Sequence, residues 1–297
     1  MTVQRFLGAA WASVHGASDP RRLLVSVLEA RFAGLGTSQA PRPLDWVALR
    51  AAAADLPFAF APVRVGNPLA EHSATRTFVS TKDGERDVAV KAIQQAAVTA
   101  RQVGVPRVVL DLGVVPLFGD IEAEDLGDPS YTWTHERAAA IRARAHAGRN
   151  GALDRACRAL FGVVKSMPDI EFCVTQSRSA RALVEPSTLQ DLFEDLHHLR
   201  LFYWHDAALA ARREQVFGEA QGEWLERFGN RCRGLSLGDA SADGLYLPPG
   251  AGGVDYAGLA SYVPRTGAAL PAVVELDTGV PPAELPGVRS CLDKFGL

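Results

Sequence analysis

Short apolar runs alternate with longer segments of helical period along the whole chain, roughly eight times. Apolar runs of this length predict strands, and the segments between them predict crossover helices, so the pattern is typical of a parallel sheet. The expected strands are 6–14, 32–36, 58–63, 107–112, 170–176, 201–205, 232–237 and 272–276. The expected helices are 20–31, 44–54, 87–103, 135–166 (or two helices broken at 148–151), one opening at Pro186, 210–228, 256–262 and 281–295.

Eight strand–helix units in 297 residues predict a (β/α)₈ TIM barrel that forms a single domain over residues 1–297. A doubly wound open sheet is the alternative, but it normally has fewer units and a Gly-rich turn after its first strand. Here residues 15–18 read His-Gly-Ala-Ser, which is no such turn. The long loop 114–134 after the fourth strand is either a lid over the barrel mouth or a surface excursion.

The composition is that of an ordinary globular protein. Hydrophobic residues make up 47% of the chain and charged residues 22%, which excludes intrinsic disorder. A net charge of −3 argues against a nucleic-acid partner, because phosphates require a basic surface. Four scattered cysteines without a CxxC pair are typical of reduced thiols, and no signal peptide or membrane-length apolar run is evident. We therefore expect a cytoplasmic protein with no nucleic-acid or membrane partner.

The active site of a TIM barrel lies at the carboxyl ends of its strands, so the polar residues that close the expected strands are candidates. They are His15, Arg64, Asp111, Gln176, Arg178, His205, Asp206, Ser236, Asp239 and Glu275. The two arginines could clamp a phosphate or carboxylate, with ordinary ion pairing as the alternative. Trp204 could form the floor of a sugar site, or simply pack in the core. No P-loop or dinucleotide fingerprint is present, so no nucleotide cofactor is expected.

Several segments in the second half of the chain carry a family likeness. They are residues 202–209 (FYWHDAAL), 234–239 (GLSLGD), 247–256 (LPPGAGGVDY) and 273–275 (VVE), preceded by 91–97 and 104–113. Together they resemble the xylose isomerase-like TIM barrels, the superfamily of sugar phosphate isomerases and epimerases. The stretch 248–255 is the most specific, because family members read Pro-Gly-x-Gly-x-x-Asp-Phe/Tyr there.

The resemblance implies a divalent metal held by Glu, Asp, His and Glu from strands five to eight. In the family the metal polarises a substrate carbonyl or hydroxyl, while the two Glu move a proton at the adjacent carbon. Carried over, Asp206 and Glu275 match the strand-six Asp and strand-eight Glu, and both become metal ligands and catalytic residues. Gln176 (Thr175 after a one-residue shift) stands in place of the first Glu, and Ser236 in place of His.

These two departures weaken the implied metal site. A hard divalent cation needs several oxygen donors and neutralising charge. Gln176 offers an oxygen without charge and Ser236 is a poor ligand, so we expect Mn²⁺, Zn²⁺ or Mg²⁺ to bind weakly unless Asp111, His205 or Asp239 substitutes. Strand alternation, however, points His205 away from the strand-six Asp.

Two functions remain open from the sequence. The favoured one is a sugar (phosphate) isomerase- or epimerase-like enzyme with an altered metal site, acting on a small carbohydrate or hydroxy-carbonyl compound through Glu275. The alternative is a catalytically inactive barrel that serves as a binding or assembly module, with its carboxylates paired to Arg178 or Arg64. The expected substrate-binding residues are Arg64, Asp111, Gln176, Arg178, Trp204, Ser236 and Asp239. Family members often form dimers or tetramers, so the resemblance also allows a homodimer.

Overall fold

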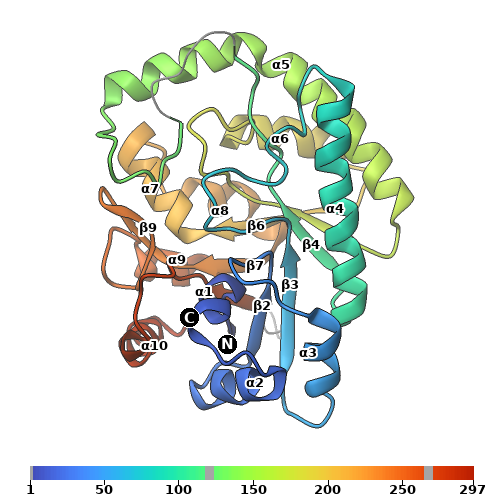
Figure 1. Cartoon of the computed structure of the whole chain (residues 1–297). Coiled ribbons are helices and arrows are strands. Elements are labelled where there is room, and N and C mark those ends of the chain that lie inside the picture. Colours follow the sequence, from blue (N-terminus) through green and yellow to red (C-terminus); the bar gives the residue numbers. More distant parts are fainter. Residues whose placement is uncertain (1–2, 118–123, 264–269) are drawn as a thin grey trace.

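Eight parallel strands close into a barrel with helices around it, as the sequence predicts (Figure 1). The computed structural model describes residues 3–117, 124–263 and 270–297. Around the ring the strands follow the order β1-β10-β7-β6-β5-β4-β3-β2, which is the sequence order of a (β/α)₈ TIM barrel. The strands are β1 (Gln4–Leu7), β2 (Gly34–Thr37), β3 (Ala59–Arg64), β4 (Arg107–Leu110), β5 (Glu171–Val174), β6 (Leu201–Asp206), β7 (Cys232–Leu237) and β10 (Pro271–Val274).

The helices follow the predicted order with local differences. They are α1 (Ala9–His15), α2 (Pro20–Glu29), α3 (Trp46–Ala52), α4 (Asp83–Val103), α5 (His135–Ser166), α6 (Pro186–Asp195), α7 (Ala207–Phe217), α8 (Glu223–Phe228), α9 (Tyr256–Tyr262) and α10 (Leu285–Phe295), with 3₁₀ turns at Gly229–Arg231 and Pro282–Glu284. Asp19 caps α2 by accepting from the Arg22 backbone N–H, and Pro20 occupies its first position. Gly104 ends α4 in the left-handed conformation (φ 77°).

The prediction of one strand over 6–14 is wrong. The strand β1 ends at Leu7, and α1 begins at Ala9 within the same apolar run. Residues 9–13 of α1 are all buried, and a helix buried on every side has no amphipathic period that would separate it from a buried strand. His15 therefore lies at the end of α1, where its ring bonds the Thr278 carbonyl at 2.7 Å, and not at a strand end.

The structure confirms a single helix over 135–166, one of the two alternatives left open there, whereas the helix expected over 210–228 differs from the prediction. The helix α5 runs unbroken for 32 residues through Gly148 and Gly151, because a buried stripe of small side chains packs along its length. The single helix expected over 210–228 is instead two helices, because Gly218 adopts the left-handed conformation (φ 71°) and ends α7.

A two-stranded hairpin follows β7 and was not predicted. It consists of β8 (Asp239–Ser241) and β9 (Gly244–Leu247), paired antiparallel. The dipeptide Asp243-Gly244 between two short apolar runs is the signal that could have found it, since Asp-Gly is favoured in tight hairpin turns. This hairpin reaches over the carboxyl end of the barrel.

The barrel interior is filled by side chains rather than open. Phe6, Ala61, Val109, Cys173, Trp204 and Val273 form this inner cluster. A larger apolar layer separates the strands from the helices. All four cysteines are free, two in strands and two in helices, as expected.

The described parts of loop 114–134 lie against the segment after β5. Val114 bridges to Ala182 and Asp125 to Ser179, while residues 118–123 lie outside the described residues. None of the described helices combines the length and hydropathy that crossing a membrane requires.

We predict that Gly34→Ala destabilises the barrel by about 3 kcal/mol, because a Cβ there would overlap the Ala59 backbone of the adjacent strand. The control is Gly162→Ala on the exposed side of α5, where no atom lies within 4 Å of the new methyl group. It should raise stability by up to about 1 kcal/mol through helix propensity. Urea unfolding of wild type and both variants measures their free energies of unfolding. Equal values for the two variants would contradict the prediction.

Candidate active site at the barrel mouth

Four positions singled out by the sequence meet at the carboxyl end of the barrel. Asp206 and Ser236 are register partners at the ends of β6 and β7. Glu275 follows β10, and its backbone N–H donates to the Leu237 carbonyl at 2.8 Å. The Oε1 atom of Gln176 accepts from the backbone N–H of Asp206 at 3.1 Å. All four side chains are buried, with exposed fractions between 0% and 4%.

The guanidinium of Arg64 lies among these side chains. It comes from the end of β3, and its Nη1 donates to Asp206 Oδ2 at 2.8 Å and to Ser236 Oγ at 3.4 Å. Burial disfavours the charged form, yet the pKa of Arg64 lies well above its ordinary value because acidic groups surround it. These groups are the phenol of Tyr246 and the carboxylates of Asp206 and Glu275. Arg64 is therefore a fixed positive charge at the mouth.

Tyr246 on β9 covers this ion pair from outside. Its hydroxyl donates to Asp206 Oδ2 at 3.1 Å, and its side chain is 1% exposed. Burial raises the pKa of Tyr246 above its usual value, so the phenol remains a hydrogen-bond donor at neutral pH. The backbone at Tyr246 has φ 60°, the left-handed region that a bulky residue rarely adopts.

The Gln176 side chain is held by a hydrogen-bond chain that leads out of the barrel. Its Nε2 donates to Tyr203 Oη at 2.8 Å, and Tyr203 Oη donates to His205 Nδ1 at 2.9 Å. Burial lowers the pKa of His205 to about 3, so its ring is neutral and can accept at Nδ1. His205 lines a pocket between α8 and α9, away from the mouth, as strand alternation predicts. Gln176, not Thr175, lines the chamber at the mouth.

Trp204 and Asp239 hold neighbouring parts of the site through hydrogen bonds. Trp204 lies inside the barrel, and its Nε1 donates to Ser236 Oγ at 2.9 Å. The Asp239 carboxylate accepts from the backbone N–H groups of Ala240, Gly250 and Val254, each at 2.9 Å. Asp239 thus holds the loop 248–255, the stretch on which the family likeness is most specific.

Asp111 and Arg178 lie at the rim. Asp111 accepts from Thr75 Oγ1 at 2.9 Å and from the Gly113 N–H at 2.8 Å. Arg178 forms a bidentate pair with Asp125 at 2.7 and 2.6 Å, and its third donor bonds the Leu69 carbonyl. The positive charge of Arg178 is therefore already neutralised.

Glu275 differs from every other carboxylate of the mouth. Its Oε2 is buried and bonds no described residue. Burial raises its pKa to about 7, with Asp206 adding to the shift and Arg64 opposing it. The carboxyl packs against Gly8, where any side chain would overlap Oε2. Glu275 is thus a proton donor and acceptor suited to neutral pH.

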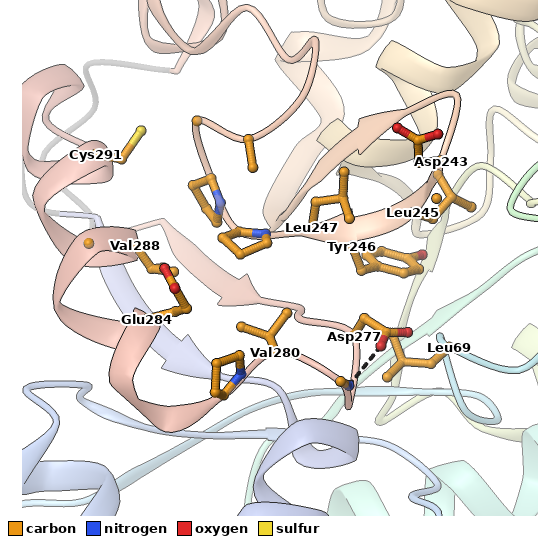
Figure 2. A pocket seen from close by; sticks show the side chains of 18 of the residues that line it. Leu69, Asp243, Leu245, Tyr246, Leu247, Asp277, Val280, Glu284, Val288 and Cys291 are labelled. Atoms are coloured by element: carbon orange, nitrogen blue, oxygen red, sulfur yellow. Dashed lines mark hydrogen bonds between the residues drawn. The ribbon is translucent and has the colours of Figure 1, made fainter. Parts of the chain in front are cut away.

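Two cavities meet at Tyr246. An inner chamber of about 20 Å³, lined by Arg64, Asp111 and Gln176 among others, has room for about one water. An outer groove of about 1060 Å³ lies between β9, the loop after it and α10 (Figure 2). Tyr246 and Arg178 line both cavities.

The residues at the mouth do not fit a divalent metal ion. No group of three His, Cys, Asp or Glu that could hold an ion occurs in the described part of the chain. The Gln176 oxygen is bonded to a backbone N–H, and the Ser236 oxygen accepts from Trp204 and Arg64. A cation at this point would also face the guanidinium of Arg64, which repels it.

Comparison with solved structures identifies the fold. The chain superposes on the D-psicose 3-epimerase of Clostridium cellulolyticum H10 with TM-score 0.66 and 13% identity, covering 99% of this chain and 98% of that one. The 3-keto-D-glucoside 4-epimerase of E. coli gives TM-score 0.66 and 10% identity, over 99% and 100%. The fold is that of the xylose isomerase-like TIM barrels. A putative sugar phosphate isomerase/epimerase from Anabaena variabilis shares it with TM-score 0.59 and 13% identity, over 97% and 88%.

No family model matches the chain, and no curated protein sequence matches it. At these identities the likeness to the xylose isomerase-like barrels establishes the architecture, and function must be argued from the site itself.

We predict that Glu275→Gln flattens the pH dependence of stability. A carboxyl whose native pKa is raised from 4.5 to about 7 adds stability at low pH that is lost as the pH rises through this window. That loss is about 3 kcal/mol in the native protein and absent in the variant. Urea unfolding at pH 4.5 and pH 8 tests it, with Glu29→Gln at an exposed position as control. If the free energies of unfolding of wild type, Glu275→Gln and Glu29→Gln changed equally between the two pH values, the prediction would be contradicted.

Proposed function

We propose that this protein is an isomerase- or epimerase-like enzyme that acts on a small, uncharged hydroxy-carbonyl compound of the sugar class. The observation that carries the proposal is Glu275, a buried carboxyl with an unpartnered oxygen and a pKa of about 7 at the end of the closing barrel strand. The sugar epimerases named above share this barrel, which supports the assignment of the substrate class.

The proposed reaction uses one base. The ionised Glu275 removes a proton from the carbon next to the substrate carbonyl, and negative charge develops on the carbonyl oxygen. Arg64 stabilises that oxygen, because its Nε and Nη2 groups bond no described residue and remain free to donate. Glu275 then returns the proton to the same face of the substrate. Return to the same carbon restores the substrate, whereas return to the neighbouring carbon gives the isomer after the remaining hydroxyl proton of the enediolate has passed between its two adjacent oxygens.

The single base narrows the reaction class. Gln176 stands where the family places its second Glu, and an amide cannot carry a proton at neutral pH. Inversion at one carbon needs a second group on the opposite face, whereas transfer between adjacent carbons on one face needs only Glu275. The site therefore favours aldose–ketose isomerisation over two-base epimerisation.

The charges at the mouth favour an uncharged substrate. Arg64 is paired with Asp206, and Arg178 with Asp125. The lining of the inner chamber contains no other cationic side chain among the described residues. A phosphate group would add negative charge that no unpaired cation of this lining offsets, although Arg64 keeps free N–H donors, whereas hydroxyl groups can bond to Asp111 and the Gln176 amide.

A catalytically inactive binding or assembly module is the second candidate. The observation that favours it is the closed mouth, since Tyr246 bonds Asp206 above a chamber of only about 20 Å³, and Glu275 is not among the residues that line this chamber or the outer groove. Catalysis requires the β8–β9 hairpin to withdraw Tyr246 toward the outer groove.

Proton exchange in D₂O separates the two candidates. We expect the protein to incorporate deuterium at the carbon next to the carbonyl of a neutral ketose, detected by NMR over a panel of pentoses and hexoses and their phosphates. The rate should fall as the pH drops below about 7, because the base must be ionised. Glu275→Gln should reduce it at least ~100-fold.

The exposed Glu29→Gln variant is the control and should retain the full rate. No exchange with any sugar would favour the inactive module. Exchange with sugar phosphates alone would contradict the charge argument.

A further inference from the structure

The position of Arg64 explains both departures from the metal-ligand set that the sequence implies. We propose that the Arg64 guanidinium is a permanent internal cation that occupies the place of a divalent metal ion and makes the site complete without one. The idea that Arg64 acts as the electrophile in catalysis rests on the proposed function. The idea that Arg64 is the cation of the site does not.

Charge compensation is the first argument. Asp206 is fully buried and Glu275 is 4% exposed, and ionised carboxylates at such depth require a nearby cation. Arg64 supplies it, with its own side chain only 13% exposed. The other arginine of the chamber lining, Arg178, is occupied by Asp125.

The two substitutions balance the exchange of cations. Replacing a divalent ion by a guanidinium removes one positive charge, and Gln176 in place of Glu removes one negative charge. The net charge of the centre is therefore unchanged. This balance explains why the position carries an isosteric amide.

Space and hydrogen bonding account for Ser236. Its Oγ lies within hydrogen-bond distance of both Arg64 Nη1 and Trp204 Nε1. The hydroxyl of Ser236 is smaller than an imidazole ring and accepts the Arg64 N–H, an interaction that a metal-binding histidine would not make. The Gln176 oxygen, turned to the Asp206 backbone, likewise offers nothing to a metal.

Chemical rescue tests the assignment without any need for turnover. Arg64→Ala leaves a cavity beside Asp206, and its melting temperature should fall. Methylguanidinium at 10 mM should recover at least half of that fall, while wild type and the exposed-site control Arg22→Ala should not respond. A folded Arg64→Ala variant, checked by circular dichroism, that is not destabilised or not rescued would overturn the proposal.

If Arg64→Ala does not fold, the length-matched pair Arg64→Lys and Arg64→Met replaces it. The ammonium should keep the protein more stable than the thioether, because it retains a positive charge beside the buried Asp206 carboxylate. An Arg64→Met variant as stable as Arg64→Lys, or more stable, would overturn the proposal.

Metal titration provides the second arm. Mn²⁺, followed by electron paramagnetic resonance, should not bind wild type or the Gln176→Glu/Ser236→His variant, because Arg64 still occupies the centre. Adding Arg64→Ala to that pair should create a 1:1 site. Stoichiometric Mn²⁺ binding to wild type that Asp206→Asn abolishes would overturn the cation assignment. Absence of deuterium exchange would instead overturn only the proposed function.

Discussion

The ion pair between Arg64 and Asp206 joins the parts of the barrel mouth. Asp206 ends β6 and caps α7 through its Oδ1, while its Oδ2 accepts from Arg64 on β3 and from Tyr246 on the hairpin. A buried carboxylate with this many donors is satisfied, but it tolerates the loss of its cation poorly. Two strands, a helix and the covering hairpin thus depend on one charge pair.

That pair also determines the chemistry open to Glu275. Because Arg64 bonds Asp206 directly, it only partly offsets the burial of Glu275, whose pKa settles near 7 instead of at that of a fully paired acid. A second full ion pair would have lowered it, and the absence of any nearby cation would have raised it further. The unequal sharing of one guanidinium leaves the two carboxylates in different states. Asp206 is ion-paired, whereas Glu275 has a raised pKa and an unpartnered oxygen.

Hydrophobic periodicity and the Gly and Pro residues between segments predicted the barrel, because each strand–helix unit has its own local sequence pattern. The strand β7 and the helix α9 match their expected bounds. The segment 6–14 was assigned wrongly because a buried helix and a buried strand look alike in an apolar run. The expectation of a weakened metal site at Gln176 and Ser236 came from the family likeness and stays a prediction. Arg64 was one of the two arginines named from the sequence as partners for the mouth carboxylates. The sequence could not choose between Arg64 and Arg178, since Arg64 lies 142 residues from Asp206 and meets it only across the closed barrel.

The closed mouth does not by itself argue against catalysis. Withdrawing Tyr246 breaks a hydrogen bond to a charged acceptor, which costs roughly 2 kcal/mol. It also releases a bulky residue from the left-handed backbone region, where strain of about 1 kcal/mol or more is stored. The ring would move toward a groove lined by Leu245, Leu247 and Val280, so it need not become fully hydrated (Figure 2). On these two terms the closed mouth is favoured by roughly 1 kcal/mol, which does not exclude the open state that the proposed catalysis requires.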